Sequence, residues 1–298
     1  LSFGGFGYYL PATYIANYTI WGHTNITITD SSSIVVAGEN ITFTGFIEND
    51  LQIPLDREVT ILWDGITRTK VNSINGNFSG TFVVPSNTIA GNHTLTALID
   101  DQNFLRASSD DVEVLVMRET EITVQWLGGF RNSSSVVSGY LRDVVGVGLS
   151  DYQLEVYFDG EYVGNVTTGE SGIFVYDLFI EKETELGNHE VGVVFEGSYL
   201  YLSSGEEVSS EVLANTFFTT EPLEVFRLQE FNLSGYLVDD LGNPMANQPI
   251  NVTFRSSTHY LITDSMGFVE KNITLSSTHA LGLHVAQWSY NGHEYYLP

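Results

Sequence analysis

Short stretches of alternating apolar and polar residues follow one another along almost the whole chain. A period of two is typical of β-strands with one buried face, and no apolar stripe of helical period reaches a useful length. Gly, Asn, Asp and Pro separate the stretches, as they do at the turns of a β-sandwich. In the first third of the chain the pattern predicts strands at about 24–29, 33–36, 39–48, 58–64, 66–72, 77–84, 92–100 and 111–117. The first two could be halves of one split strand.

The same series of strand starts recurs twice more. Leu10, Leu105, Leu202 and Leu297 are 95, 97 and 95 residues apart, and residues 288–298 match residues 1–11. A fixed period of this length indicates an array of similar domains. Three sets of glycines begin corresponding strands in the three copies: Gly45, Gly139 and Gly235; Gly76, Gly172 and Gly267; and Gly91, Gly187 and Gly282.

The array is expected to have four parts. Residues 1–21 would be the final hairpin and strand of a preceding or neighbouring repeat. Residues 22–118, 119–214 and 215–298 would be repeats 1, 2 and 3, and repeat 3 would lack its last strand. The length of 298 residues agrees with this division, because single domains of about 100 residues are common.

One run carries a resemblance to a known family. Gly-Tyr-Leu-Val-Asp-Asp-Leu-Gly-Asn-Pro-Met-Ala-Asn-Gln-Pro-Ile-Asn-Val-Thr-Phe at 235–254, with the Gly-Phe and Gly-Asn-His strand starts, is similar to bacterial and archaeal immunoglobulin-like repeats. Such repeats occur in surface-layer proteins, stalks and adhesins. The resemblance covers nearly the whole chain and implies an all-β fold of tandem immunoglobulin-like β-sandwich domains arranged as a rod. It implies no functional residue, because the family includes many spacer domains without a site.

Asn-x-Ser/Thr sequons are unusually frequent. They begin at 10 of the 20 Asn residues, although Ser and Thr make up only 54 of the 298 residues. The motif marks N-glycosylation sites on the surface of exported proteins. The alternative is a β-rich chain that is simply full of Asn, Ser and Thr. The ten residues are Asn17, Asn25, Asn40, Asn77, Asn92, Asn132, Asn165, Asn232, Asn251 and Asn272.

Side-chain parity supports the glycan interpretation. Within 25–29, 40–44, 77–84 and 250–254, the sequon Asn shares a face with Ser or Thr, while Ile, Phe and Val take the other face. Because alternate residues of a strand face opposite sides, these sequons are expected on the solvent side.

Charge and composition exclude several partners and chemistries. With 11 basic and 37 acidic residues, the net charge is −26, which repels nucleic acids and anionic membranes. There is no Cys, so thiol catalysis and Cys-ligated metals are excluded. The chain shows neither an apolar run of membrane-spanning length nor a signal peptide. The sequons therefore predict an extracellular or cell-surface location, with any targeting segment outside this sequence or removed.

No catalytic motif is found, and the chain is predicted not to be an enzyme. Residues 169–172 lack the spacing of a nucleophile elbow, and neither His-Glu-x-x-His nor a phosphate-binding glycine loop occurs. His93, His189 and His284 recur at one repeat position on inward faces. They are either ligands or, as we favour, strand-end histidines that are hydrogen-bonded to the backbone.

Acidic pairs are the best candidates for a cofactor site. Carboxylates in turns or near domain ends offer hard oxygen ligands that could hold Ca²⁺ between domains. No Asp-x-Asp-x-Asp-Gly loop accompanies them, and solvated turn carboxylates are the alternative. No other cofactor is predicted. The candidate ligands are Asp100, Asp101, Asp110, Asp111, Asp239 and Asp240.

Residues 8–20 are expected to supply the last strand of a repeat whose body lies elsewhere. Tyr14, Ala16, Tyr18 and Ile20 would face the core that this strand completes. Three arrangements stay open. The sequence is a window cut from a longer array, or one subunit donates this strand to the next, or the strand completes repeat 3 of the same chain. The duplicated ends favour the window.

These features together predict a structural component of a glycosylated extracellular assembly: a surface layer, stalk or filament of an archaeal cell. The expected partners are copies of the chain or further repeats of the same protein, and N-linked glycans. The competing hypothesis is an adhesin or carbohydrate-binding protein that uses the loops of one domain. A non-repeating insertion in one copy would favour it, and none is seen.

Overall fold

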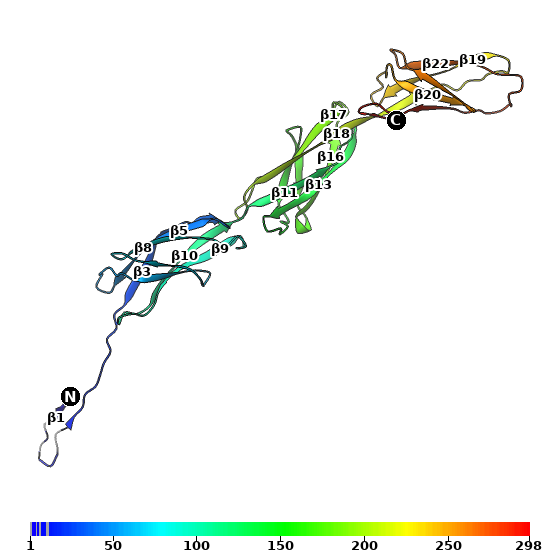
Figure 1. Ribbon diagram of the computed structural model, residues 1–298. Helices are drawn as coiled ribbons and strands as arrows, with labels where there is room; N and C mark the ends of the chain where they lie inside the picture. The colour runs from blue at the N-terminus through cyan, green and yellow to red at the C-terminus, as the bar shows by residue number, and fades with distance from the viewer. Residues whose placement is uncertain (1, 4, 6, 10–11) are drawn as a thin grey trace. The chain divides into compact units, whose positions relative to one another are not determined.

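The structure, a computed structural model, describes residues 2–3, 5, 7–9 and 12–298 (Figure 1). Leu10, one of the four leucines of the predicted alignment, lies outside the described residues. In the described part of the chain, the regular elements are β-strands apart from one short 3-10 turn, η1 (Glu170–Gly172). No helix in this part is long and apolar enough to cross a membrane.

The chain divides into two compact units. One comprises the residues up to Glu119 together with Gly197–Leu202, and the other Thr120–Glu196 together with Ser203–Pro298. The second unit therefore holds most of repeat 2 and all of repeat 3.

Repeat 1 is a sandwich of two sheets. Its strands are β3 (Thr24–Ser31), β4 (Ile34–Val36), β5 (Asn40–Asn49), β6 (Glu58–Trp63), β7 (Ile66–Asn72), β8 (Asn77–Val83), β9 (Gly91–Ile99) and β10 (Ser108–Met117). One sheet has the order β3-β5-β8 and the other the order β4-β10-β9-β6-β7. The predicted split strand is confirmed, because β3 belongs to the first sheet while β4 pairs in parallel with β10 in the second.

Inward-facing residues of both sheets form the core of repeat 1. Ile41, Trp63 and Leu95 come from three different strands, and each is at most 1% exposed. Burying an apolar side chain of this size contributes about 1.5–3 kcal/mol. The alternation seen in the sequence is thus the alternation between core and solvent.

Repeat 2 repeats this architecture. Its strands are β11 (Thr120–Trp126), β12 (Gly129–Phe130), β13 (Ser133–Asp143), β14 (Gln153–Phe158), β15 (Glu161–Thr167), β16 (Ile173–Ile180), β17 (Gly187–Phe195) and β18 (Ser204–Thr219). The sheets are β11-β13-β16 and β15-β14-β17-β18, and β12 pairs in parallel with β18 as β4 does with β10.

Repeat 3 is built from the same elements with one difference. Its strands are β19 (Glu230–Asp239), β20 (Pro249–Phe254), β21 (Ser257–Ile262), β22 (Phe268–Thr274), β23 (Ala286–Tyr290) and β24 (Tyr296–Leu297). β19 and β22 extend from β18, and the second sheet is β21-β20-β23. Among the described residues β23 pairs only with β20, whereas its counterparts β9 and β17 each lie between two strands.

The strand β18 belongs to two repeats. Over Ser204–Val212 it pairs with β17 of repeat 2, and over Thr216–Thr219 it pairs with β19 of repeat 3. The boundary expected at 214/215 therefore falls inside a continuous strand. The corresponding strands β10 and β11 are separate, since β10 ends at Met117 and β11 begins at Thr120.

The first described residues form a small antiparallel pair. β1 (Ser2–Phe3) pairs with β2 (Ala12–Thr13). That residues 1–21 complete another repeat stays a prediction. Residues 14–20 belong to no strand.

Candidate functional site at the junctions of the repeats

In each repeat, the tip of the last hairpin pairs with the chain segment that leads into the same repeat. The tips are residues 102–105, 198–201 and 293–296, each closed by hydrogen bonds between its first and last residue. The backbone hydrogen bonds that join these tips to the entering chain are 2.8–3.0 Å long. The backbone N–H and C=O groups of the segments that lead into the repeats are thereby hydrogen-bonded within the protein. The parallel pairs are Leu105 with Gly22, Tyr201 with Arg118, and Tyr296 with Ala214.

This pairing shifts the alignment of the repeats by one residue. Leu105 corresponds to Tyr201, 96 residues further on, and to Tyr296, another 95 residues on, rather than to Leu202 and Leu297. Apolar residues stand on both sides of the true position in repeats 2 and 3. Hydrophobic pattern alone therefore could not fix the register.

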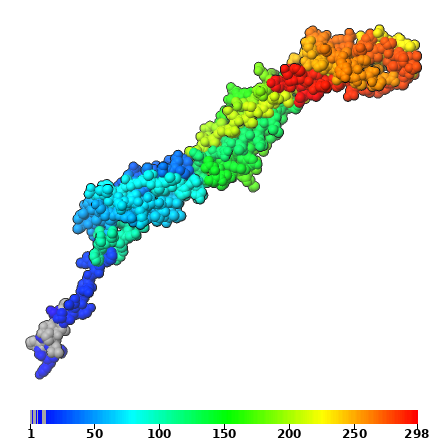
Figure 2. Space-filling view, in the orientation of Figure 1, coloured from blue at the N-terminus to red at the C-terminus, as the bar shows by residue number. Residues whose placement is uncertain are grey.

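The last residues of the chain are held against the end of repeat 2. Figure 2 shows them in red beside the yellow-green end of β18. The Ala214 N–H donates to the Tyr295 carbonyl at 2.9 Å, and the Thr216 hydroxyl donates to the Leu297 carbonyl at 2.8 Å.

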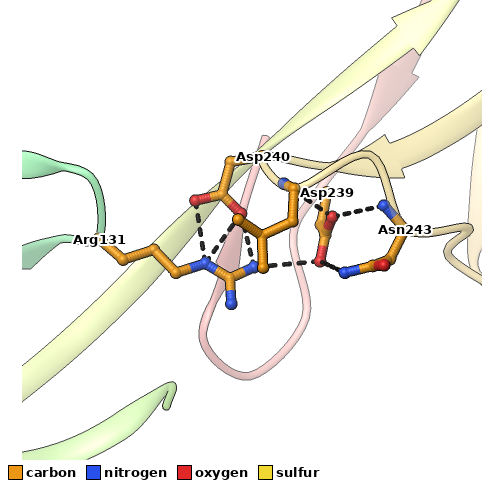
Figure 3. A network of polar contacts seen from close by, with 5 residues as sticks. Arg131, Asp239, Asp240 and Asn243 are labelled. Carbon is orange, nitrogen blue, oxygen red and sulfur yellow. Dashed lines mark hydrogen bonds and ion pairs between the residues drawn. The ribbon is translucent and has the colours of Figure 1, made fainter. Parts of the chain in front are cut away.

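Repeats 2 and 3 share a second contact, an ion-pair network around Arg131 (Figure 3). The Nε of Arg131 lies 2.9 and 3.0 Å from the two carboxylate oxygens of Asp240. Its Nη2 lies 2.6 Å from Asp240 Oδ1 and 3.0 Å from Asp239 Oδ2. The three side chains, of Arg131, Asp239 and Asp240, are only 8%, 5% and 13% exposed. A bidentate pair of this kind fixes both distance and orientation.

The turn after β19 prepares Asp239 for this contact. Asp239 accepts hydrogen bonds from the N–H groups of Leu241 and Asn243 and from the Asn243 amide. Burial alone would raise the pKa of Asp239, but these hydrogen bonds and the charge of Arg131 hold it below its usual value. The hydrogen bond to Asp240 in turn raises the pKa of Arg131. Both shifts favour the charged forms of Asp239 and Arg131.

The corresponding residues of the other repeats cannot form this network. By the pairing of β4 and β12, Arg131 corresponds to Ala37. Counting from Gly139 and Gly235, Asp240 corresponds to Val144. Neither a cation nor a second carboxylate stands at these positions, so the ion pair is particular to repeats 2 and 3.

Asp239 and Asp240 were candidates for calcium, and the structure does bring them together. Their oxygens, however, face the guanidinium of Arg131, so the geometry gives no support to calcium at this pair. Across the part of the chain that the structure describes, no group of three or more His, Asp or Glu side chains could hold a metal ion.

The other four candidate ligands are not gathered into one site. Asp101 accepts a hydrogen bond from the N–H of Ala107 at 2.6 Å. Asp110 accepts one from the N–H of Ile28 at 2.8 Å. Both carboxylates thus stabilise neighbouring backbone. Asp100 and Asp111 are exposed.

The recurring histidine connects two turns of its sandwich. In repeat 1 the Nε2–H of His93 donates to the Ile89 carbonyl at 2.9 Å, and its Nδ1 lies 2.7 Å from Asp64 Oδ2. The ring stacks on Trp63 at 5.4 Å between centroids. Burial opposes the shift, but hydrogen bonds from the Thr94 N–H and from His93 lower the pKa of Asp64. The expected hydrogen bond to the backbone is confirmed.

The same arrangement occurs in repeat 2 but is incomplete in repeat 3. His189 contacts the Glu185 carbonyl and lies 2.6 Å from Asp159. In repeat 3, His284 keeps the backbone contact to Ala280, while Arg255 stands where Asp159 would be. Sequence reasoning missed the Asp partner. The recurring Asp-Gly of the turns at 64–65 and 159–160, 29 and 30 residues before the histidine, was the available signal.

The predicted glycosylation sites lie on the surface, nine of them in the three repeats and Asn17 in the segment before β3. Nine of the ten sequon Asn residues are exposed, and Asn251 on β20 is half-buried. Exposure meets the steric requirement of an attached glycan. Their occupancy stays a prediction.

Residues 14–20, the predicted donor segment, belong to no strand, and donation stays a prediction; β23 of repeat 3 pairs on one side only among the described residues. Tyr14, Tyr18 and Ile20 are 71%, 88% and 86% exposed, and Ala16 is half-buried. In repeat 3 a groove of about 1100 Å³ lies between residues 220–227 and 280–284, with Phe254, Ala286 and Trp288 among its lining residues. In repeats 1 and 2, β10 and β18 pair along the corresponding strand.

No protein-family model and no curated protein matches the chain. Two solved structures of a three-domain immunoglobulin-like fragment from the I-band of titin are similar to it in fold, each at 11% identity. One has a TM-score of 0.52 and covers 91% of this chain and 92% of the fragment. The other, a Glu-to-Ala variant, has a TM-score of 0.54 and covers 89% and 94%.

The adhesin FdeC of Escherichia coli is also similar, at 17% identity with coverage of 95% and 97%, but at a TM-score of 0.40, which is too low to bear on function. The titin fragments show the fold alone: the chain consists of tandem immunoglobulin-like β-sandwiches.

Proposed function

We propose that the chain is a structural component of a glycosylated extracellular assembly, in which immunoglobulin-like repeats act as a spacer. One observation carries the proposal. The most specific polar contacts between repeats 2 and 3, the pairing of residues 293–296 with β18 and the Arg131 network, fix one repeat to the next. Contacts of this kind transmit position rather than chemistry.

The exposed sequons and the net charge of −26 support the extracellular part of the proposal. Glycopeptide mass spectrometry of the protein from its native cells tests it. We expect glycans on several of the ten sequons, beginning with the fully exposed ones. Unmodified Asn at all ten positions in protein recovered from the cell surface would contradict a glycosylated assembly.

We also propose, as the finer part of this assembly, that repeat 3 accepts a strand of the β10 type. Residues 14–20 fit by repeat correspondence: the β9–β10 register would place Tyr18 opposite His284, Ala16 opposite Ala286 and Tyr14 opposite Trp288. Addition of such a strand to a sheet edge is a known mode of subunit assembly.

Strand donation has two direct tests. Deleting residues 1–21 should stop polymerisation while repeats 1 and 2 stay folded. Mixing an Ile15→Cys chain with a Gln287→Cys chain should give a cross-link between chains, because these residues would be opposite each other, whereas Ile15→Cys with Ser289→Cys should not. Unchanged assembly after the deletion would exclude donation and leave the spacer proposal standing.

A further inference from the structure

The outer face of the three-stranded sheet differs between repeat 2 and the other repeats. β8, β16 and β22 are corresponding edge strands. β8 carries the exposed sequon residue Asn77, and β22 carries Asn272. β16 carries no sequon, and its outward residues Ile173, Val175 and Phe179 are 44%, 58% and 50% exposed. Ile173 stands where β8 has Asn77, and Asp177 stands where β22 has Asn272. Ile173, Val175 and Phe179 form an apolar strip on β16.

The neighbouring strand extends this strip. Val136 and Tyr140 on β13 are 54% and 38% exposed. The outward charged residues of the sheet are Glu121, Arg142 and Asp177, which leave a net charge of only −1 on this face. The whole chain carries −26. Two copies of such an acidic chain repel each other strongly except where both present a weakly charged surface.

The backbone of β16 is also available for pairing beyond Ile173, whose N–H donates to the Glu170 carbonyl and whose carbonyl accepts from the Gly169 N–H at 2.7 Å. β16 pairs with β13 on one side, and no strand in the described part of the chain pairs with its other side. Edge strands are commonly protected by Lys, Pro or a β-bulge. β16 contains no Lys and no Pro, and its register with β13 is unbroken. In contrast, β22 carries Glu270 and Lys271.

We propose that β16 is an interaction surface for a second copy of this chain, whose own β16 adds to it in antiparallel orientation about a two-fold axis at Tyr176. In this register Ile173 lies opposite Phe179 of the partner subunit, and Val175 lies opposite Asp177 of the partner subunit. Like faces then meet, as the period of two requires.

The neighbouring registers are less favourable. An axis at Asp177 would place the two Asp177 carboxylates directly opposite each other, which destabilises a sheet pair. An axis at Val175 would leave Phe179 without an opposite residue on β16 and shorten the paired segment. Charge and length therefore select the axis at Tyr176.

The contact is weak when made by a single pair of chains. A stable interface buries about 1,200–2,000 Å², and one added strand pair covers less. We expect a dimer with a dissociation constant of about 10 μM to 1 mM, which becomes effective where many chains are held together on one surface. The inference goes beyond the spacer function and holds whether or not the sequons are occupied.

Two substitutions at one position test the register with opposite signs. The pair Val175 and Asp177 of the partner subunit occurs twice in the dimer by symmetry. Val175→Lys should tighten the dimer and Val175→Asp should weaken it, each by about 2- to 30-fold, which is the range for two cross-strand charge pairs. Sedimentation equilibrium of the full chain measures both. Thr81→Lys and Thr81→Asp on β8 are matched controls that should leave the dissociation constant unchanged.

A cross-link provides an independent test, because the chain has no Cys. An Ile173→Cys chain mixed with a Phe179→Cys chain should form a disulfide-linked pair on oxidation, while either chain alone should not, since identical positions lie at opposite ends of the contact. A monomer at concentrations up to about 1 mM, equal effects of Val175→Lys and Val175→Asp, or preferential linking of Val175→Cys to Phe179→Cys would each overturn the proposal.

Discussion

Repeats 2 and 3 place a histidine at the same position but give it different partners. His189 contacts a backbone carbonyl and Asp159, and its ring stacks on Phe158 at 5.3 Å and 8°. His284 keeps only the carbonyl among these polar contacts, and its ring meets Phe254 at 6.3 Å and 65°. The difference follows from one turn, which reads Asp-Gly in repeat 2 and Arg-Ser in repeat 3.

The comparison shows that a recurring residue need not contribute equally in each repeat. An aromatic ring, a histidine and an Asp-Gly turn together close one end of the sandwich in repeats 1 and 2. Repeat 3 retains two of the three parts, and its aromatic residue Phe254 lines the groove instead. At the other end of repeat 3, Asp239 and Asp240 bind Arg131 of repeat 2.

The largest effect is expected at the contact of Asp239 and Asp240 with Arg131. Arg131→Met would leave two nearly buried carboxylates without a cation, at a cost of about 3–5 kcal/mol to the unit that contains repeats 2 and 3. Denaturant unfolding of the full chain, followed by hydrogen exchange in β18 and β19, measures it. Ala37→Met at the corresponding position of repeat 1 is a control and should have no comparable effect. A loss below about 1 kcal/mol would show that the ion pair does not hold these repeats together.

Removing His189 should cost more stability than removing His284. His189→Ala removes a contact to a carboxylate and one to a carbonyl, and should lower the local stability of β17 by about 2 kcal/mol. His284→Ala removes the carbonyl contact alone and should cost about 1 kcal/mol in β23. Native-state hydrogen exchange resolves the two repeats within one chain. Equal losses would mean that the carboxylate contributes nothing.

Restoring the missing partner should improve repeat 3. Arg255→Asp combined with Ser256→Gly recreates the turn of repeats 1 and 2, and we expect a gain of about 0.5–1.5 kcal/mol in β20 and β23. The reverse pair, Asp159→Arg with Gly160→Ser, should destabilise repeat 2. Native-state hydrogen exchange of both variants measures the gain of stability in repeat 3 and the loss in repeat 2. If neither variant changed the stability of its repeat, the different histidine contacts of repeats 2 and 3 would be due to packing rather than to the turn.

The smallest expected effect is on the pH dependence of stability, through Asp64, the partner of His93 in repeat 1. Because the pKa of Asp64 is lowered in the folded state, its contribution is present above the unfolded value of about 3.9 and is lost as the pH falls through the lower folded value. Asp64→Asn should therefore reduce the dependence of stability on pH below about 4. Circular dichroism melting of the wild-type chain and the variant between about pH 2.5 and 5 tests this sign. Steeper loss in the variant would contradict it.

The strands were predictable because each repeat alternates between core and solvent in short runs. β3 and β4, for example, were foreseen as halves of one strand, and Ile41 and Phe43 as its neighbours in the core. The contacts that give the repeats their character were not predictable. Arg131 and Asp240 are 109 residues apart, and alternation within one repeat does not say which turn faces which in the next.

The same limit applies to the histidine. Its inward position followed from parity, but Asp64 belongs to a turn 29 residues earlier, and only the three-dimensional pairing of β6 with β9 brings the two together. The one-residue error at Leu202 arose likewise, because a row of apolar residues satisfies alternation in either register. The strand that a residue pairs with, and not the alternation of apolar and polar residues, determines its register.

The continuous strand β18 also has a consequence for the order of folding. Its first half completes repeat 2, so that its second half is already extended when the chain of repeat 3 emerges from the ribosome. β19 can then pair with an existing strand instead of forming a nucleus of its own, which lowers the entropy cost of starting that sandwich. We therefore expect repeat 3 to fold onto a strand that repeat 2 has already ordered, whereas Arg118 and Glu119 separate β10 from β11, so that repeat 2 has no such strand to begin on.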